Sequence, residues 1–160
     1  MNIQTLFDIL RKKIHIFANI KHEDNNMKLR MEKSKVSYVI SVSLGTDCYR
    51  HIQISVKKTL DYFAGCIIDA FNFDFDHLYS FFMDNKWWSQ INAYNSPYSE
   101  EPPYANQIKL SQLRLSKGQA FKFLFDYGDE WRFQCKVLRV LDEDTPESLR
   151  ACVHKLPQII

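Results

Sequence analysis

Apolar residues near the start of the chain recur at intervals of three and four positions, which places them on one face of a helix. They are Ile3, Leu6, Phe7, Leu10, Ile14 and Phe17. Such a stripe predicts an amphipathic helix that packs on its own domain, on a second copy of the chain or on a partner. A basic helix can also lie on a membrane surface, which is the less favoured alternative. The polar segment 21–35 lacks this periodicity and is predicted to be a linker.

Alternation of apolar and polar residues begins after this segment. Residues 36–43 and 49–56 both alternate, as expected of strands with one buried face. The turn residues at 45–47 between them predict a hairpin. Apolar residues over 60–71 then return to helical spacing, and Thr59 is suited to cap the start of that helix.

The middle of the chain is less regular. Short strands are predicted at 77–83 and 87–91. Residues 92–106 contain several prolines and are predicted to form a long surface loop. A loop of this length within a compact domain is usually mobile or functional. A short helical turn is predicted to follow over 110–115.

The clearest local pattern is a closing hairpin. Its first strand carries three aromatic residues on one face, namely Phe121, Phe123 and Phe125. Residues 126–130 supply the connection, and 131–140 form the returning strand. The alternation changes face at Leu138, which indicates a β-bulge. Residues 146–153 are predicted to form a last short helix, because Pro146 suits a first helical turn.

This order of elements predicts the fold class. Neighbouring strands with few crossovers indicate an α+β domain with a mainly antiparallel sheet and helices packed on one face, in a roll-like arrangement. The amphipathic helix at the N-terminus is additional to it. We therefore predict an N-terminal helix and polar linker at 1–35 and an α+β domain at 36–160.

Charge is distributed unevenly between these two parts. Residues 1–35 hold eight Lys and Arg against four Asp and Glu, whereas the rest of the chain holds 13 against 15. The body is therefore not a basic nucleic-acid clamp, and attraction for phosphate would come from the N-terminal segment or a local patch. With 160 residues, the chain has room for one domain and an appendage.

The sequence contains few motifs of known chemistry. The cysteines form no CxxC pair, and they are Cys48, Cys66, Cys135 and Cys152. We expect reduced thiols and a cytoplasmic location, because neither a secretory signal nor an apolar run of about 20 residues is present. A P-loop, a dinucleotide glycine fingerprint, a GxSxG elbow and an HExxH motif are all absent.

Several segments occur in an order that resembles one known family. They are Ser37–Leu44, Tyr49–Ile52, Thr59–Leu60, Ala70–Phe71, His77–Phe81 and Phe125-Asp126-Tyr127-Gly128-Asp129-Glu130-Trp131. From residue 36 onward the chain resembles the Ri-plasmid ORF-three-like family, also labelled insertion-element passenger TnpR-like, and the MM-type hypothetical proteins. This resemblance implies a roll-like α+β domain from a bacterial plasmid or mobile element, and it implies no established reaction.

The sequence departs from the family pattern at two places. The family usually has Trp-Arg where this chain has Tyr49-Arg50. A histidine often follows the last tryptophan, whereas Arg132 follows Trp131 here. An activity that depended on those positions would be altered in this chain.

The acidic connection of the closing hairpin has two interpretations. Asp126 and Asp129 can hold a divalent cation together with water. Alternatively, their side chains accept hydrogen bonds from turn amides while Gly128 takes a positive φ. His77 can meet this turn as a general base, a ligand or a hydrogen-bonded corner residue. Arg50 suits an anion anchor or an ion pair with either aspartate.

Aromatic residues crowd the middle of the chain, and they are Trp87, Trp88, Tyr94, Tyr98 and Tyr104. Exposed rings there can stack on bases, anchor a protein partner or pack the loop on the sheet. We take as candidate binding residues Arg50, His77, Trp87, Asp126, Asp129 and Trp131.

Two functions are compatible with these patterns. The first is a non-enzymatic interaction module of plasmid or mobile-element origin, with a protein or nucleic-acid partner and with a homodimer through the N-terminal helix as one arrangement. The alternative is a metal-assisted hydrolase acting on phosphodiesters, with Asp126 and Asp129 as metal ligands and His77 as base. No cofactor is expected in the first case, and a divalent metal is expected in the second.

Overall fold

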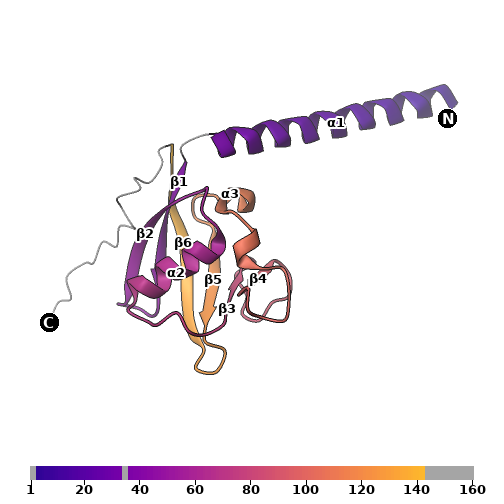
Figure 1. Ribbon diagram of the computed structural model, residues 1–160. Coiled ribbons are helices and arrows are strands. Elements are labelled where there is room, and N and C mark those ends of the chain that lie inside the picture. The colour runs from indigo at the N-terminus through magenta and orange to yellow at the C-terminus, as the bar shows by residue number, and fades with distance from the viewer. Residues whose placement is uncertain (1–2, 34–35, 143–160) are drawn as a thin grey trace. The chain divides into compact units, whose positions relative to one another are not determined.

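The computed structural model describes residues 3–33 and 36–142 of the chain. The chain divides into two compact units, Met1–Lys33 and Ser34–Ile160. Helix α1 (Ile3–Lys33) belongs to the first unit (Figure 1). The helix predicted at 146–153 lies outside the described residues.

Helix α1 corrects the linker predicted at 21–35, because it continues through this segment to Lys33. The segment has no glycine or proline to interrupt the helix. In addition, the side chain of Asn26 hydrogen-bonds to His22 one turn earlier, at 3.0 Å. The apolar side chains of Ile14 and Phe17 are exposed on α1. Their pairing with a second copy or a partner stays a prediction.

The second unit contains one sheet, which has six strands in the described residues, in the order β2-β1-β6-β5-β3-β4 (Figure 1). Every pairing among these strands is antiparallel. The strands are β1 (Ser37–Ser43), β2 (Tyr49–Ser55), β3 (Tyr79–Phe82), β4 (Ala93–Asn95), β5 (Ala120–Phe125) and β6 (Trp131–Leu141). The predicted α+β class and antiparallel sheet are confirmed.

Helix α2 (Leu60–Ala70) packs on one face of this sheet (Figure 1). Thr59 caps it as predicted, since its hydroxyl accepts a hydrogen bond from the Tyr62 amide at 3.1 Å. The short elements η1 (Ala105–Gln107) and α3 (Leu110–Leu113) follow later in the chain, and α3 lies where a helical turn was predicted.

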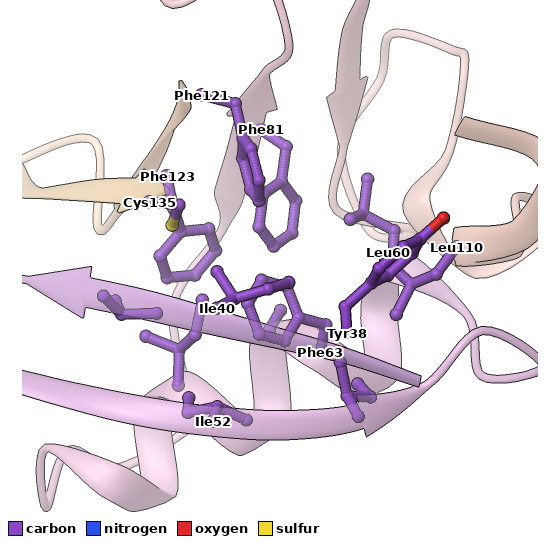
Figure 2. Packing of buried hydrophobic residues seen from close by; sticks show 14 of the residues in the cluster. Tyr38, Ile40, Ile52, Leu60, Phe63, Phe81, Leu110, Phe121, Phe123 and Cys135 are labelled. Carbon is purple, nitrogen blue, oxygen red and sulfur yellow. The ribbon is translucent and has the colours of Figure 1, made fainter. Parts of the chain in front are cut away.

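The core lies between α2 and the sheet. Figure 2 shows the ring of Phe63 gathered with Ile40, Phe81 and Phe123 in one apolar cluster. The rings of Phe63 and Phe81 are stacked with their centroids 5.9 Å apart. Burying a side chain of this size stabilises the fold by about 1.5–3 kcal/mol. This cluster therefore fixes the positions of the strands that carry the candidate site.

Strand β6 contains the bulge that the sequence predicts. Val39 of β1 lies opposite Arg139, whereas the next residue, Ile40, lies opposite Val137. Leu138 is therefore the extra residue of the bulge. Because of it, the apolar Val137 remains in the core while Arg139 does not.

The region after β3 differs from the sequence prediction. The strand predicted at 87–91 is wrong, because these residues form turns and bends in which Trp88 has a φ of 57°. The side chain of Asp84 holds this turn by accepting hydrogen bonds from the Lys86 amide at 3.2 Å and the Ser89 hydroxyl at 2.6 Å. Strand β4 lies instead within the segment predicted as loop. Among the described residues no helix is long and apolar enough to cross a membrane.

Candidate functional site

The β5–β6 hairpin ends in a turn that the side chain of Asp126 organises. Its Oδ1 accepts hydrogen bonds from the amides of Gly128 at 2.9 Å and Asp129 at 3.4 Å. Its own amide donates to the carbonyl of Leu78 at 2.9 Å, which fastens the turn to the segment before β3. The side chain of Asp126 therefore accepts hydrogen bonds from turn amides, as in the structural interpretation of this segment. Asp129 is exposed.

The role expected of Gly128 requires a correction. Positive φ angles in this turn occur at Asp126, with 59°, and at Glu130, with 52°, and not at Gly128. Space is tight at the glycine instead, because a Cβ atom at Gly128 would lie 3.3 Å from Oδ1 of Asp126, which would have to shift slightly. Asp tolerates the left-handed conformation better than most residues. The turn therefore combines a left-handed aspartate with a close approach to glycine.

His77 meets the turn, as the sequence suggested. Its Nε2 lies 3.5 Å from Oδ2 of Asp126, and its Nδ1 lies 2.6 Å from Oδ1 of Asp76. The hydrogen bond with Asp76, followed by the negative charges of Asp126 and Asp129, raises the pKa of His77 above its usual value of 6.5. The edge of the imidazole ring also packs on Phe125, with centroids 5.9 Å apart.

In these contacts the polar groups of the turn and of His77 serve as one another's hydrogen-bond or ionic partners. One oxygen of the Asp126 carboxylate accepts turn amides and the other faces His77. The described part of the chain holds no group of three His, Cys, Asp or Glu residues placed to bind a metal. The geometry therefore lends no support to the metal-assisted hydrolase.

Arg50 lies elsewhere, at the start of β2. Its Nε donates a hydrogen bond to the carbonyl of Ala70 at 3.2 Å, and its guanidinium lies 5.1 Å from the ring centroid of Phe71. This placement corrects the ion pair expected with Asp126 or Asp129. A cation suits the last turn of α2, because the free carbonyls there carry partial negative charge. Arg50 thus closes the end of a helix.

The two predicted binding tryptophans both contact neighbouring side chains, and Trp131 is still 39% exposed. Trp131 packs edge-on against Phe73, with centroids 4.9 Å apart. The ring of Trp87 lies 4.5 Å from Nζ of Lys122 and 5.2 Å from the guanidinium carbon of Arg132. Trp87 therefore covers the part of the sheet where β5 and β6 present these two cations.

Two of the three described thiols are partly or fully enclosed by the fold, whereas that of Cys48 is exposed. Cys48, Cys66 and Cys135 are free, and Cys152 lies outside the described residues. Burial raises the pKa of the Cys66 thiol to about 11. Burial also raises the pKa of Cys135, which is fully enclosed in the core. Both of these buried thiols stay protonated at neutral pH and act as packing groups.

A cleft that the sequence did not reveal lies beside the hairpin turn. Its volume is about 860 Å³, and it is bounded by β3, β4, the loop that connects β4 to η1, and Tyr127. Side chains alternate along a strand, so Ser80 and Phe82 point away from Tyr79 and Phe81 of the core. The cleft is therefore on the face of the sheet opposite α2.

The cleft has a floor of connected polar groups. The hydroxyl of Tyr127 lies 2.7 Å from Oγ of Ser80 and donates to the carbonyl of Tyr79 at 3.0 Å. The hydroxyl of Ser80 donates to Oδ1 of Asn95 at 2.5 Å. Nδ2 of Asn95 in turn donates to the carbonyl of Glu101 at 2.9 Å. This chain of hydrogen bonds fastens the loop to the sheet and to the hairpin turn.

Aromatic and acidic side chains form the walls. Trp88 and Tyr127 lie with their ring centroids 5.7 Å apart and their planes at 60°. Tyr98 is 88% exposed, and Glu100 and Glu101 are also on the lining. Burial raises the pKa of Tyr127, and the negative charge of Glu101 raises it further. The lining of the cleft therefore combines aromatic rings with acidic residues.

Comparison with known proteins identifies the fold and the family. The crystal structure of MM3350, a protein of unknown function from Methanosarcina mazei Go1, matches with a TM-score of 0.59 and 18% sequence identity, over 77% of this chain and 70% of that chain. At this identity the likeness concerns the fold alone. No curated protein matches the sequence. Residues 36–156, most of the chain, match the family described as plasmid pRiA4b ORF-3-like protein, and the chain therefore belongs to that family.

Proposed function

We propose that this protein is a non-enzymatic binding module and that its ligand site is the cleft beside Tyr127. The observation that supports this proposal is a preformed cavity of about 860 Å³ with aromatic walls and a hydrogen-bonded floor. Ligand sites in proteins are usually largely preformed and measure roughly 300–1,000 Å³. The cleft fits that description in size, and aromatic side chains form part of its lining.

The lining favours a protein segment over a nucleic acid as ligand. Trp88 and Tyr98 are 49% and 88% exposed, and exposed aromatic rings are common anchors in protein interfaces. Nucleic-acid backbones are held mainly by lysine and arginine. The residues that line the cleft include Glu100 and Glu101 and neither of those cations. We therefore assign the site to a peptide or an exposed loop of a partner within plasmid or mobile-element biology.

A peptide array probed with the full-length protein tests this function. Tyr98→Ala removes an exposed ring from the cleft, so peptides that bind the wild-type protein should bind this variant about tenfold more weakly. Tyr62→Ala is the matched control, because Tyr62 is an exposed tyrosine on α2 that does not line the cleft. Fluorescence anisotropy of the selected peptides gives the dissociation constants.

Two results would contradict the proposal. The first is an array on which no peptide binds above background. The second is a set of peptides that bind the wild type and Tyr98→Ala equally, which would place the site elsewhere. Duplex and single-stranded DNA fragments serve as a further comparison, and at physiological salt we expect them to bind no better than a scrambled peptide.

A further inference from the structure

The charged residues that line the cleft are all acidic. Glu100 and Glu101 belong to the lining, and none of the described residues that line it is a lysine, an arginine or a histidine. The nearby cations of the same sheet face, Lys122 and Arg132, are held on the ring of Trp87. A positively charged ligand would therefore find carboxylates in the cleft without a lining cation to compete for them.

The aromatic walls are suited to the same kind of ligand. A cation within about 6 Å of a ring centroid is attracted by the electrons of the ring face. The chain already uses this interaction elsewhere, with Lys122 over Trp87 and Lys58 over Tyr62, each at 4.5 Å. Trp88 is half exposed and meets Tyr127 at an angle of 60°, so the two rings form a corner.

The acidic loop is positioned before any ligand arrives. The carbonyl of Glu101 accepts hydrogen bonds from Nδ2 of Asn95 at 2.9 Å and from the hydroxyl of Ser99 at 3.3 Å. Trp88 is held in a left-handed conformation with a φ of 57°, which is unusual for a bulky residue and is often found at binding sites. Because the backbone of these residues is already ordered, little of its conformational entropy is lost on binding.

We propose that the cleft recognises an alkylammonium group, as presented by a lysine side chain of the partner segment, through the rings of Trp88, Tyr98 and Tyr127 and the carboxylate of Glu101. This inference rests on the proposed function and specifies its ligand chemistry. The ammonium group occupies only part of a cavity of about 860 Å³, and the remaining space accommodates the neighbouring peptide.

Nuclear magnetic resonance titrations of the full-length protein test this chemistry with small probes. The probes are the N-acetyl amides of lysine, of norleucine, which is its neutral analogue, and of glutamate. We expect the lysine probe to shift the signals of Trp88, Tyr98 and Glu101 with an affinity at least about tenfold above that of norleucine. The glutamate probe should give no saturable shift, because its charge repels the acidic lining.

Two single-charge variants sharpen the result. Glu101→Gln should weaken binding of the lysine probe about fivefold, because it removes a negative charge from the lining of the cleft. Asp129→Asn is the matched control, since it removes an exposed carboxylate from the hairpin turn outside the lining, and it should leave the affinity unchanged. Higher salt should weaken the lysine probe more than the norleucine probe.

The outcomes separate this inference from the function on which it rests. Norleucine binding as tightly as lysine would overturn the ammonium inference while leaving a binding cleft. The ammonium inference is also overturned if array peptides bind at the cleft but contain no lysine. If no array peptide and no probe binds, both the inference and the proposed function fail.

Discussion

Asp126 and Tyr127 are neighbours in the β5–β6 turn, and their side chains make contacts on two different sides of this turn. On the Asp126 side, the carboxylate is shared between turn amides and His77. On the Tyr127 side, the hydroxyl is bound to Ser80 while the ring lines an open cleft. On the first side the polar groups are paired with one another, and the second side presents ring faces and carboxylates to solvent.

This difference shows that conspicuous residues need not be the ones that bind. Aspartates around a glycine suggest a metal or a catalytic site, yet here Asp126 stabilises the turn that places Tyr127. The less conspicuous tyrosine between them reaches the cleft. A group whose hydrogen-bonding capacity is used within the fold stabilises that fold, whereas a group left partly free can hold a ligand.

The largest expected effect on stability comes from removing Phe125, the buried side chain that supports both sides of the turn. Phe125 precedes Asp126, is 2% exposed and packs against Phe73 and His77, each with centroids 5.9 Å away. Phe125→Ala should lower the free energy of unfolding by about 3–5 kcal/mol, because it leaves a cavity under the turn. Urea denaturation followed by circular dichroism measures this change.

Ile91→Ala is the control for that measurement, since Ile91 is 72% exposed and a surface change of this kind alters stability by less than about 0.5 kcal/mol. A Phe125→Ala protein as stable as this control would show that the two sides have no common apolar support. The Asp126 side and the Tyr127 side of the turn could then not be treated as two parts of one supported structure.

A smaller effect should distinguish the two aspartates. Asp126→Ala removes the acceptor of two turn amides and the partner of His77, so it should cost about 1–2 kcal/mol. Asp129→Ala should change stability by less than about 0.5 kcal/mol, because that side chain is exposed. Asp126→Asn should be intermediate, since asparagine retains an acceptor and tolerates a positive φ.

These three variants can be compared by urea denaturation at one pH. Equal losses for Asp126→Ala and Asp129→Ala would contradict the assignment of the turn to Asp126 alone. If Asp126→Ala leaves stability unchanged but abolishes peptide binding, the Asp126 side is itself a site, and the contrast between the two sides is wrong.

The smallest effect concerns the proton on His77. Its pKa in the folded protein is raised above 6.5, so the protonated form is favoured by folding. The resulting stabilisation is fully present below pH 6.5 and is lost as the pH rises through the folded pKa. Proton resonance titration of the imidazole should give a wild-type pKa above 6.5.

The same titration ranks the two carboxylate partners of His77. Asp76→Asn should lower its pKa more than Asp126→Asn does, because the hydrogen bond with Asp76 is the largest cause of the shift. A greater decrease in Asp126→Asn would make Asp126 the principal partner. A wild-type pKa at or below 6.5 would show that His77 is not paired at this turn.

Local patterns were sufficient to predict most of the sheet. Alternation identifies the β1–β2 and β5–β6 hairpins, and a change of phase at Leu138 locates the bulge. Thr59 identifies the start of α2 through its side-chain capping. The polar segment 21–35 was misjudged because weak apolar periodicity does not prevent a helix when glycine and proline are absent.

The candidate site was less predictable, because its contacts join segments that are distant in the sequence. His77 could be placed near the turn from strand order, but the partner of Arg50 depends on how α2 ends. The cleft depends on a hydrogen bond from Ser80 to Asn95 across β3 and β4. Strand β4 has only three residues, too few for a periodic signal. The sequence offered the long loop at 92–106, its aromatic residues and the polar Ser80 as signs, but none of these patterns located the cleft itself.

The origin of the cleft lining along the chain has a consequence for how that lining can change. Apart from Tyr127, all of its residues belong to the single stretch between Leu78 and Pro103. Within β3, the alternate side chains Tyr79 and Phe81 belong to the buried cluster. Changes to the cleft-facing residues of this one stretch would therefore alter the lining while leaving those two inward-facing aromatic residues in the core.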